Sequence, residues 1–185
     1  NNNLLAGFNT IGSSGTFETV GVNYTFASGP TALTIATGGR LNIGRAGVGN
    51  SSTITVTGLT DYQVGSILDV VNGSIVITGG LVQRGGLRGS GTVRADVISF
   101  GAIAPGASPG VLTIDGNLQV TQDCIYECEL AGGGLTGEYD VLNVTQALNF
   151  GSGAFAGTFN LELLPGFHAV LGQQFDVMRF ADRTG

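Results

Sequence analysis

The residues from Gly89 to Asn117 read GSGTVRADVISFGAIAPGASPGVLTIDGN. Short strand-like runs such as Val97–Ser99 and Ala102–Ile103 alternate with breakers, and two of these breakers are Pro105-Gly106 and Pro109-Gly110. The stretch carries few charged residues and leaves no room for a helix. It therefore predicts short β-strands joined by tight corners.

Similar runs recur through most of the chain at a spacing of about 21 residues. The main series is Leu33–Ile35, Ile54–Val56, Ile75–Ile77, Val97–Ser99, Leu118–Val120, Val141–Asn143 and Leu161–Leu163. A weaker second series is Leu41–Ile43, Tyr62–Val64, Val82, Ala102–Ile103, Ile125 and Leu148. A fixed period with several short strands per repeat is typical of a parallel β-helix, because a single coil cannot bury its own apolar face.

The sequence thus predicts an all-β fold, a right-handed parallel β-helix (solenoid) with about 21 residues per coil and a modified C-terminal end. An antiparallel sandwich has a similar density of strands. It requires hairpins and a turn signal every 8–12 residues or so, rather than a repeat with three corners.

The composition agrees with a solenoid of many corners. The 185 residues include 33 Gly, and 42% are hydrophobic, which argues against disorder. Only 11% are charged, and the net charge is −6 with no Lys. Nucleic acid and anionic membrane surfaces are therefore not expected as partners, because both require clustered basic residues. No apolar run approaches the ~18–20 residues of a transmembrane helix.

Three segments differ in pattern. Residues 1–30 are polar and loosely patterned, and they predict an N-terminal capping or irregular segment. Residues 31–150 hold the regular coils, and residues 151–185 are rich in Phe and predict terminal coils that continue the same solenoid. The final residues follow a strand-like run directly, so we expect the chain to be a piece of a longer protein.

No catalytic constellation stands out. His168 is the only histidine and lies in an apolar turn, without the Gly-x-Ser-x-Gly motif of a serine hydrolase. Asp96, Asp115, Glu138 and Asp140 are the carboxylates that a polysaccharide-degrading enzyme would need as a pair, and Arg94 lies near Asp96 on the same strand face. The simpler interpretation assigns them to turns and solvated pairs. We expect no cofactor and no metal site.

Two groups of side chains are candidates for surface interactions. Arg40, Arg45, Arg84, Arg88 and Arg94 would line one side of the solenoid if the coils stack in register, and they would then meet acidic glycans or a neighbouring subunit. Tyr62 and Tyr139 are candidate exposed aromatic residues for glycan binding.

Cys124 and Cys128 are too few for a disulfide framework. In an extended strand, residues four apart are separated by ~13 Å, which is beyond the reach of a disulfide. We interpret them as buried thiols, and a local or intermolecular disulfide remains the alternative.

The series GLRGSGTV, GAIAPGASPGVLTIDGN, YECELAGG, GEYDVLNVTQALNFGSG and QQFDVMRF resembles the β-helical passenger regions of bacterial surface proteins. These include autotransporter passengers and exported proteins of the PEP-CTERM type. The likeness covers about residues 85–183. It implies an exported bacterial protein, extracellular or on the cell surface, and no catalytic residue to transfer. It also places Cys128 where an inward aliphatic residue is usual, which agrees with a buried thiol.

The expected function is therefore that of a non-enzymatic structural or adhesive β-solenoid. Its partners would be further copies of itself, added head to tail into a filament, or cell-surface glycans. A glycan-binding β-helix of the adhesin or tailspike type is the alternative, and a polysaccharide-degrading enzyme is a third.

Overall fold

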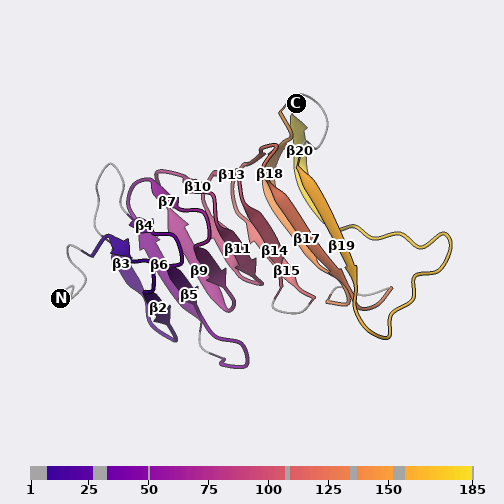
Figure 1. The fold of residues 1–185 in the computed structure, drawn as a ribbon, viewed down its shortest axis with the longest axis horizontal. Helices are drawn as coiled ribbons and strands as arrows, with labels where there is room; N and C mark the ends of the chain where they lie inside the picture. The colour runs from indigo at the N-terminus through magenta and orange to yellow at the C-terminus, as the bar shows by residue number, and fades with distance from the viewer. Residues whose placement is uncertain are drawn as a thin grey trace.

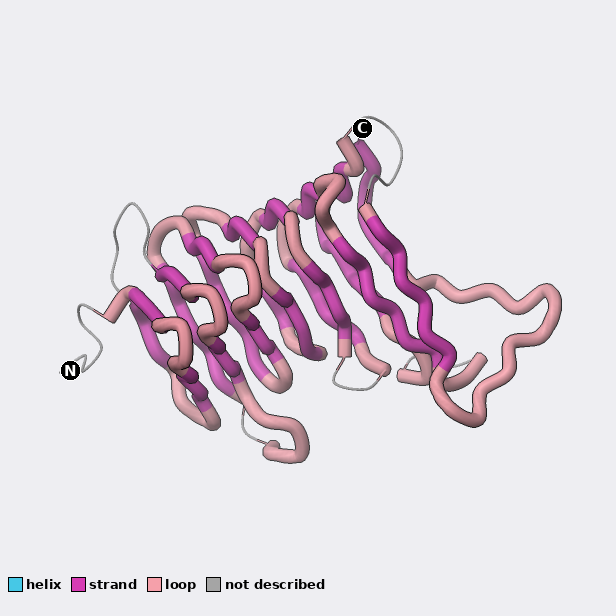
Figure 2. Tube along the Cα trace, viewed as in Figure 1, coloured by secondary structure: helices cyan, strands magenta, loops and turns pink. Residues whose placement is uncertain are grey.

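A computed structural model describes residues 8–26, 33–49, 51–106, 109–133, 137–151 and 157–184. Within these ranges the chain forms β-strands and loops without any helix (Figures 1 and 2). The described part accordingly contains no helix that could cross a membrane. The strands wind into coils that stack into an elongated body (Figure 1).

Each complete coil contributes one strand to each of three stacks, which we name the first, second and third faces. The first face holds β1 (Thr10–Ile11), β4 (Leu33–Ile35), β7 (Thr60–Tyr62), β10 (Leu81–Gln83), β13 (Val97–Ser99) and β16 (Leu118–Val120). The second holds β2 (Thr16–Thr19), β5 (Arg40–Ile43), β8 (Ile67–Val70), β11 (Gly86–Gly89), β14 (Ala102–Pro105), β17 (Ile125–Leu130) and β19 (Thr158–Leu163). The third holds β3 (Tyr24–Phe26), β6 (Ser52–Val56), β9 (Gly73–Ile77), β12 (Thr92–Arg94) and β15 (Val111–Ile114).

The last coils close the third face onto the first. β18 (Val141–Asn149) turns this corner, because its first half pairs with β15 and its second half pairs with β16. β20 (Met178–Thr184) follows β18 around the same corner. Neighbouring strands in all three stacks run parallel, which confirms the predicted parallel β-helix.

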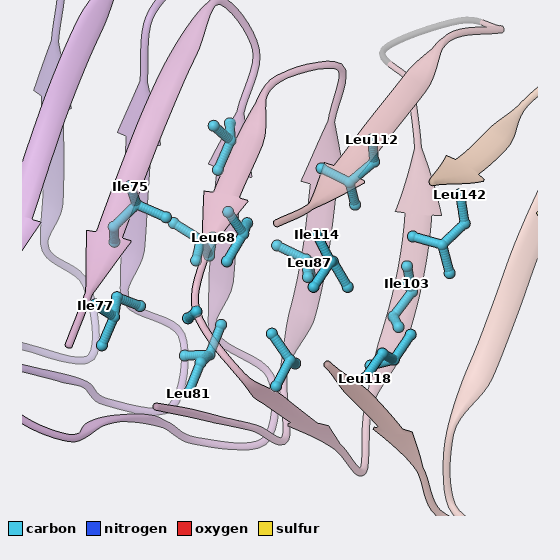
Figure 3. Packing of buried hydrophobic residues seen from close by; sticks show 14 of the residues in the cluster. Leu68, Ile75, Ile77, Leu81, Leu87, Ile103, Leu112, Ile114, Leu118 and Leu142 are labelled. Atoms are coloured by element: carbon cyan, nitrogen blue, oxygen red, sulfur yellow. The ribbon is translucent and has the colours of Figure 1, made fainter. Parts of the chain in front are cut away.

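The core consists of columns of inward side chains that run along the body (Figure 3). On the second face, Leu68, Leu87 and Ile103 are in register on successive strands, and all three are buried. Alternation within each strand directs every second side chain inward, and the parallel register places it on the equivalent side chain of the next coil. Each such aliphatic residue contributes about 1.5–3 kcal/mol by leaving water.

Coil lengths vary around the predicted value. On the first face, the in-register positions Leu33, Thr60, Leu81, Val97 and Leu118 are 27, 21, 16 and 21 residues apart. The mean is about 21 residues, as the sequence predicted, but the loops at the corners differ in length.

The two predicted series of strands do not correspond to two faces. Leu33–Ile35 and Val97–Ser99 lie on the first face, whereas Ile54–Val56 and Ile75–Ile77 lie on the third and Leu161–Leu163 lies on the second. Alternation shows which side chains point inward but does not show which face a strand belongs to, so the two series did not predict the faces.

The N-terminal segment is more regular than the sequence predicted. Residues 1–7 and 27–30 of the expected cap lie outside the described residues. Within the described part, β1, β2 and β3 form a first coil on the same three faces as the later coils. Phe8 precedes this coil, and its ring centroid lies 5.5 Å from that of Phe17 and 5.7 Å from that of Phe26. Phe8 thus covers the apolar end of the first coil.

Candidate functional site

Apolar side chains at core positions are exposed on the last strands that the structure describes. Phe159, Leu161 and Leu163 on β19 are in register with three buried residues of β17, so they occupy core positions. Their exposed fractions are nevertheless 44, 54 and 49%. Phe180 on β20 is in register with buried Val144 and is 41% exposed. We name Phe159, Leu161, Leu163 and Phe180 the C-terminal end surface.

The opposite end of the β-helix is covered. In the first coil, Ile11 is 3% exposed and Phe26 is fully buried. The aromatic rings of Phe8, Phe17 and Tyr24 gather there, with a distance of 5.6 Å between the centroids of Phe17 and Tyr24. The two ends therefore differ in kind, because the core positions are sealed at one end and exposed at the other.

The loop that joins β19 to β20 extends from the C-terminal end. It projects to the right of β19 along the long axis of the molecule (Figures 1 and 2). Within this loop, Val170 and Leu171 are highly exposed. Its base is anchored by Phe175, whose ring lies 5.4 Å from that of Tyr139, and by a 3.1 Å hydrogen bond from the side-chain amide of Gln173 to the Gly133 carbonyl. These contacts tie the loop to the segment between β17 and β18.

The edge strands at this end carry balanced charge. Their ionisable residues are Glu162 on β19 and Arg179, Asp182 and Arg183 on β20. Two acids and two arginines sum to zero, whereas the whole chain has a net charge of −6. A second surface can therefore approach this end without the repulsion that the chain as a whole would exert.

The predicted carboxylates do not converge. Asp96 accepts hydrogen bonds of 2.9 Å from both the backbone and side-chain amides of Asn117. Asp115 accepts a 2.9 Å hydrogen bond from Thr145 and pairs with Arg94, whose Nε lies 3.4 Å from the carboxylate. The sequence placed Arg94 beside Asp96, which is wrong because the parallel register brings the next coil, with Asp115, to Arg94 instead.

Asp140 is a buried carboxylate that holds two segments together. Its Oδ1 accepts the Gly110 N–H at 2.8 Å and its Oδ2 accepts the Glu129 N–H at 2.9 Å. Burial raises the pKa of Asp140, and the two backbone N–H groups oppose that rise. Nearby Glu138 lies in the loop before it, where its backbone carbonyl accepts the N–H groups of two residues of the preceding turn. Asp140 is therefore a structural corner residue, which agrees with the simpler interpretation of the sequence.

Replacing Asp140 with asparagine should lower the free energy of unfolding by about 1–3 kcal/mol, because one buried N–H then faces an amide NH2 group instead of an acceptor. The matched control is Asp96→Asn at an exposed position, where a change within about 0.5 kcal/mol is expected. Urea denaturation of both variants measures the difference. Equal stabilities of the two variants would contradict this role of Asp140.

A groove of about 500 Å³ lies over the second face. Its lining includes Asp69, Arg88, Glu127, Glu129, Asp140 and Glu162. Burial raises the pKa of Asp69, although the positive charges of Arg40 and Arg88 act in the opposite direction. Nowhere in the described ranges do three or more His, Cys, Asp or Glu side chains form a group suited to a metal ion. The groove is acidic and would repel an acidic polysaccharide.

The five arginines do not form the predicted line. Arg40 and Arg88 lie on the second face, Arg94 lies on the third, and Arg45 and Arg84 lie in the corners that follow β5 and β10. Three of them form ion pairs, namely Arg45 with Glu18, Arg84 with Asp61 and Arg94 with Asp115. The prediction is wrong because their spacing in sequence does not match the coil steps, and exposed pairs of this kind stabilise the fold by at most about 1 kcal/mol each.

Neither predicted aromatic residue is exposed. Tyr62 is fully buried on the first face, and Tyr139 is only 9% exposed and packs against Phe175. Alternation within Thr60–Tyr62 could have predicted the burial of Tyr62, because Thr60 and Tyr62 point inward together. The sequence reasoning missed Phe100, which is 37% exposed and lies 5.5 Å beneath the guanidinium of Arg84.

Both cysteines are buried free thiols, as interpreted from the sequence. Cys128 points inward on β17 and its Sγ donates to the Asp140 carbonyl at 3.7 Å. Cys124 accepts a hydrogen bond of 3.3 Å from the Ser99 hydroxyl. Burial, assisted by the negative charge of Asp140, raises the pKa of Cys128 to about 12, and burial also raises the pKa of Cys124.

These thiols should not react in the folded protein. With a pKa of about 12, Cys128 holds only about one part in ten thousand of thiolate at pH 8. Titration with a thiol-specific chromogenic reagent should therefore detect no thiol in the native chain and both thiols after denaturation. One rapidly reacting equivalent in the native chain would contradict the burial of these residues.

His168 is exposed in the loop after β19, and it lies 28 or more residues along the chain from the predicted carboxylates.

Comparisons with protein-family models, with curated proteins and with solved structures found no match to this chain.

Proposed function

We propose that the chain is a non-enzymatic structural or adhesive β-solenoid, exported to the cell surface or the extracellular space, that acts by associating through its C-terminal end surface. The observation that carries the proposal is the exposure of the core positions Phe159, Leu161 and Leu163 at 44 to 54%. Edge strands with apolar side chains are normally covered or blunted, because they offer both unpaired backbone groups and apolar area to another strand. A surface with exposed apolar core positions and no net charge on its edge strands is suited to association.

A structural role is supported by the contacts of the charged side chains, which bond to the backbone or to neighbouring coils. Asp140 bonds to backbone, Asp96 and Asp115 hold neighbouring coils together, and three arginines are engaged in ion pairs. The likeness of residues 85–183 to passenger regions of bacterial surface proteins supports export and a location outside the cell.

Association through this end is tested by sedimentation velocity over a range of concentrations. The wild-type chain and a Val64→Arg control, changed at a position that is 67% exposed elsewhere on the molecule, should both associate. Leu161→Arg should weaken association at least about tenfold, because it places a charge in the contact. Association of Leu161→Arg at wild-type strength would contradict the proposal. Circular dichroism of each variant verifies the fold.

Glycan binding is a second candidate, supported by one observation. The exposed ring of Phe100 beneath Arg84 combines an aromatic surface with a cation, next to the partly exposed Ile98. Screening on an array of bacterial and host glycans should show binding that Phe100→Ala abolishes and Leu161→Arg leaves intact. Binding that does not depend on Phe100 would contradict this assignment.

A further inference from the structure

We propose that a groove along the first face binds a linear, uncharged polysaccharide that lies along the long axis of the molecule. This inference rests on the glycan-binding candidate of the proposed function. It specifies the class of glycan, the path of the sugar chain and the residues that contact it.

Two grooves on the outside of the first face join into one. The first has a volume of about 360 Å³ and runs from Leu59 past Val82 to Asp96 and Ile98. The second, of about 310 Å³, is also lined by Asp96 and Ile98 and continues to Asn149. Because the two share lining residues, we name them together the first-face groove.

The first-face groove crosses several strands, and its outward side chains are in register on them. They are Val82 on β10, Ile98 on β13, Gln119 on β16 and Asn149 on β18. Neighbouring strands lie ~4.8 Å apart, so four strands span at least ~14 Å. Because β10, β13 and β18 follow one another along the long axis (Figure 1), a ligand in the groove contacts several coils at once.

The lining combines apolar and hydrogen-bonding side chains. Val82 and Ile98 supply aliphatic surface, and the amide of exposed Gln119 can both donate and accept hydrogen bonds. Asp96 is held in place by the 2.9 Å hydrogen bonds that it accepts from Asn117. A sugar ring has the complementary chemistry, because its faces carry C–H groups and its edges carry hydroxyls that donate and accept.

Phe100 adds an aromatic surface beside the groove. Buried and exposed residues alternate from Asp96 to Phe100, so Phe100 points outward like Ile98, and both are 37% exposed. The guanidinium of Arg84 lies 5.5 Å from the ring centroid and pairs with Asp61, which fixes the position of the ring. A fixed aromatic ring at the side of a groove suits the apolar face of a sugar.

The charges favour an uncharged ligand. Among the described residues that line the first-face groove, Asp96 is the only ionisable one, so the groove offers no cation to a carboxylate or a sulfate. The charge of Arg84 is balanced by Asp61. The net charge of −6 would repel a polyanion further.

An extended peptide is a less suitable occupant. Peptides add to β-structure at an edge, where backbone groups are unpaired. The strands beneath the first-face groove are instead paired on both sides, β10 with β7 and β13, and β16 with β13 and β18. A ligand there must bond to side chains, which suits the hydroxyls of a polysaccharide.

Affinity electrophoresis in native gels tests the groove, with a soluble linear glucan and a soluble linear mannan as uncharged probes and polygalacturonate as the acidic probe. At least one uncharged probe should retard the wild-type chain and the Val64→Arg control equally. Ile98→Arg makes a comparable change inside the groove and should weaken binding at least about tenfold. Gln119→Ala, which removes a hydrogen-bonding group without adding bulk, should weaken it about two- to tenfold. Circular dichroism verifies the fold of each variant.

The length of the ligand tests its path. Affinity for oligosaccharides of the retained polymer should rise with length until the chain fills the span of at least ~14 Å. A disaccharide that binds as tightly as the polymer, or full retardation of Ile98→Arg, would overturn the groove and leave glycan binding at Phe100 standing. Retardation by polygalacturonate alone would overturn the uncharged class of ligand. Absence of retardation by every probe would overturn both this inference and the glycan-binding candidate.

Discussion

Replacing Leu87 with alanine should lower the free energy of unfolding by about 2–5 kcal/mol. Leu87 is fully buried on β11, and it is in register with Leu68 on one side and Ile103 on the other. The loss combines the transfer free energy of the deleted carbon atoms with the cavity left behind. The cavity persists because the parallel register fixes the backbone of the coils above and below.

Urea denaturation followed by circular dichroism measures the loss, and Val64→Ala is the matched control. Val64 is 67% exposed, so its truncation should change stability by no more than about 0.5 kcal/mol. A Leu87→Ala variant as stable as the Val64→Ala variant would contradict the assignment of Leu87 to the central column.

The second large effect is expected at a corner glycine. Gly44 and Gly47 both adopt the left-handed backbone conformation, with φ of 78° and 74°. A Cβ atom on Gly44 would lie 2.7 Å from the carbonyl carbon of Asn72, whereas a Cβ on Gly47 would meet no atom within 4 Å. The two positions thus share the conformational requirement and differ only in how closely the next coil approaches.

Gly47→Ala should destabilise the fold by about 1–2 kcal/mol, which is the cost of a left-handed conformation for a residue with a side chain. Gly44→Ala should cost about 1–3 kcal/mol more, because the backbone of the next coil must shift to admit the methyl group. Thermal and urea denaturation of the pair measure the difference directly. Equal losses would show that the coils do not approach each other as closely as the structure shows at Asn72.

Much of the fold could be predicted from the sequence because its causes are local. Alternation of apolar and polar residues fixes which side chains point inward, and Gly and Pro mark the corners. The burial of Cys128 follows from its place between Tyr126 and Leu130, which point inward on the same strand. The same reasoning applied to Thr60–Tyr62 would have placed Tyr62 in the core.

What could not be predicted depends on the lengths of the corner loops. A step of 16 residues between Leu81 and Val97 and one of 27 between Leu33 and Thr60 both return the chain to the same face. The sequence alone does not distinguish such steps from a change of face. For this reason Arg40 and Arg94 were expected on one side, although the structure places them on different faces.

The exposure of the C-terminal end surface could not be predicted from local sequence either. Phe159, Leu161 and Leu163 have the alternation of a normal core strand, so their sequence indicates burial. Only the order of strands shows that, among the described strands, β19 stands at the edge of its stack. The concentration of Phe residues after Phe150 was the one signal that this region differs.

Hydrogen exchange measured by mass spectrometry, on the wild-type chain at two concentrations, tests most directly whether the molecule associates through its C-terminal end. Amides of Thr158–Leu163 should exchange more slowly at the higher concentration, while those of Thr10–Thr19 should exchange at the same rate in both. Concentration-dependent protection of Thr10–Thr19, or unchanged exchange at both ends, would contradict association through the C-terminal end.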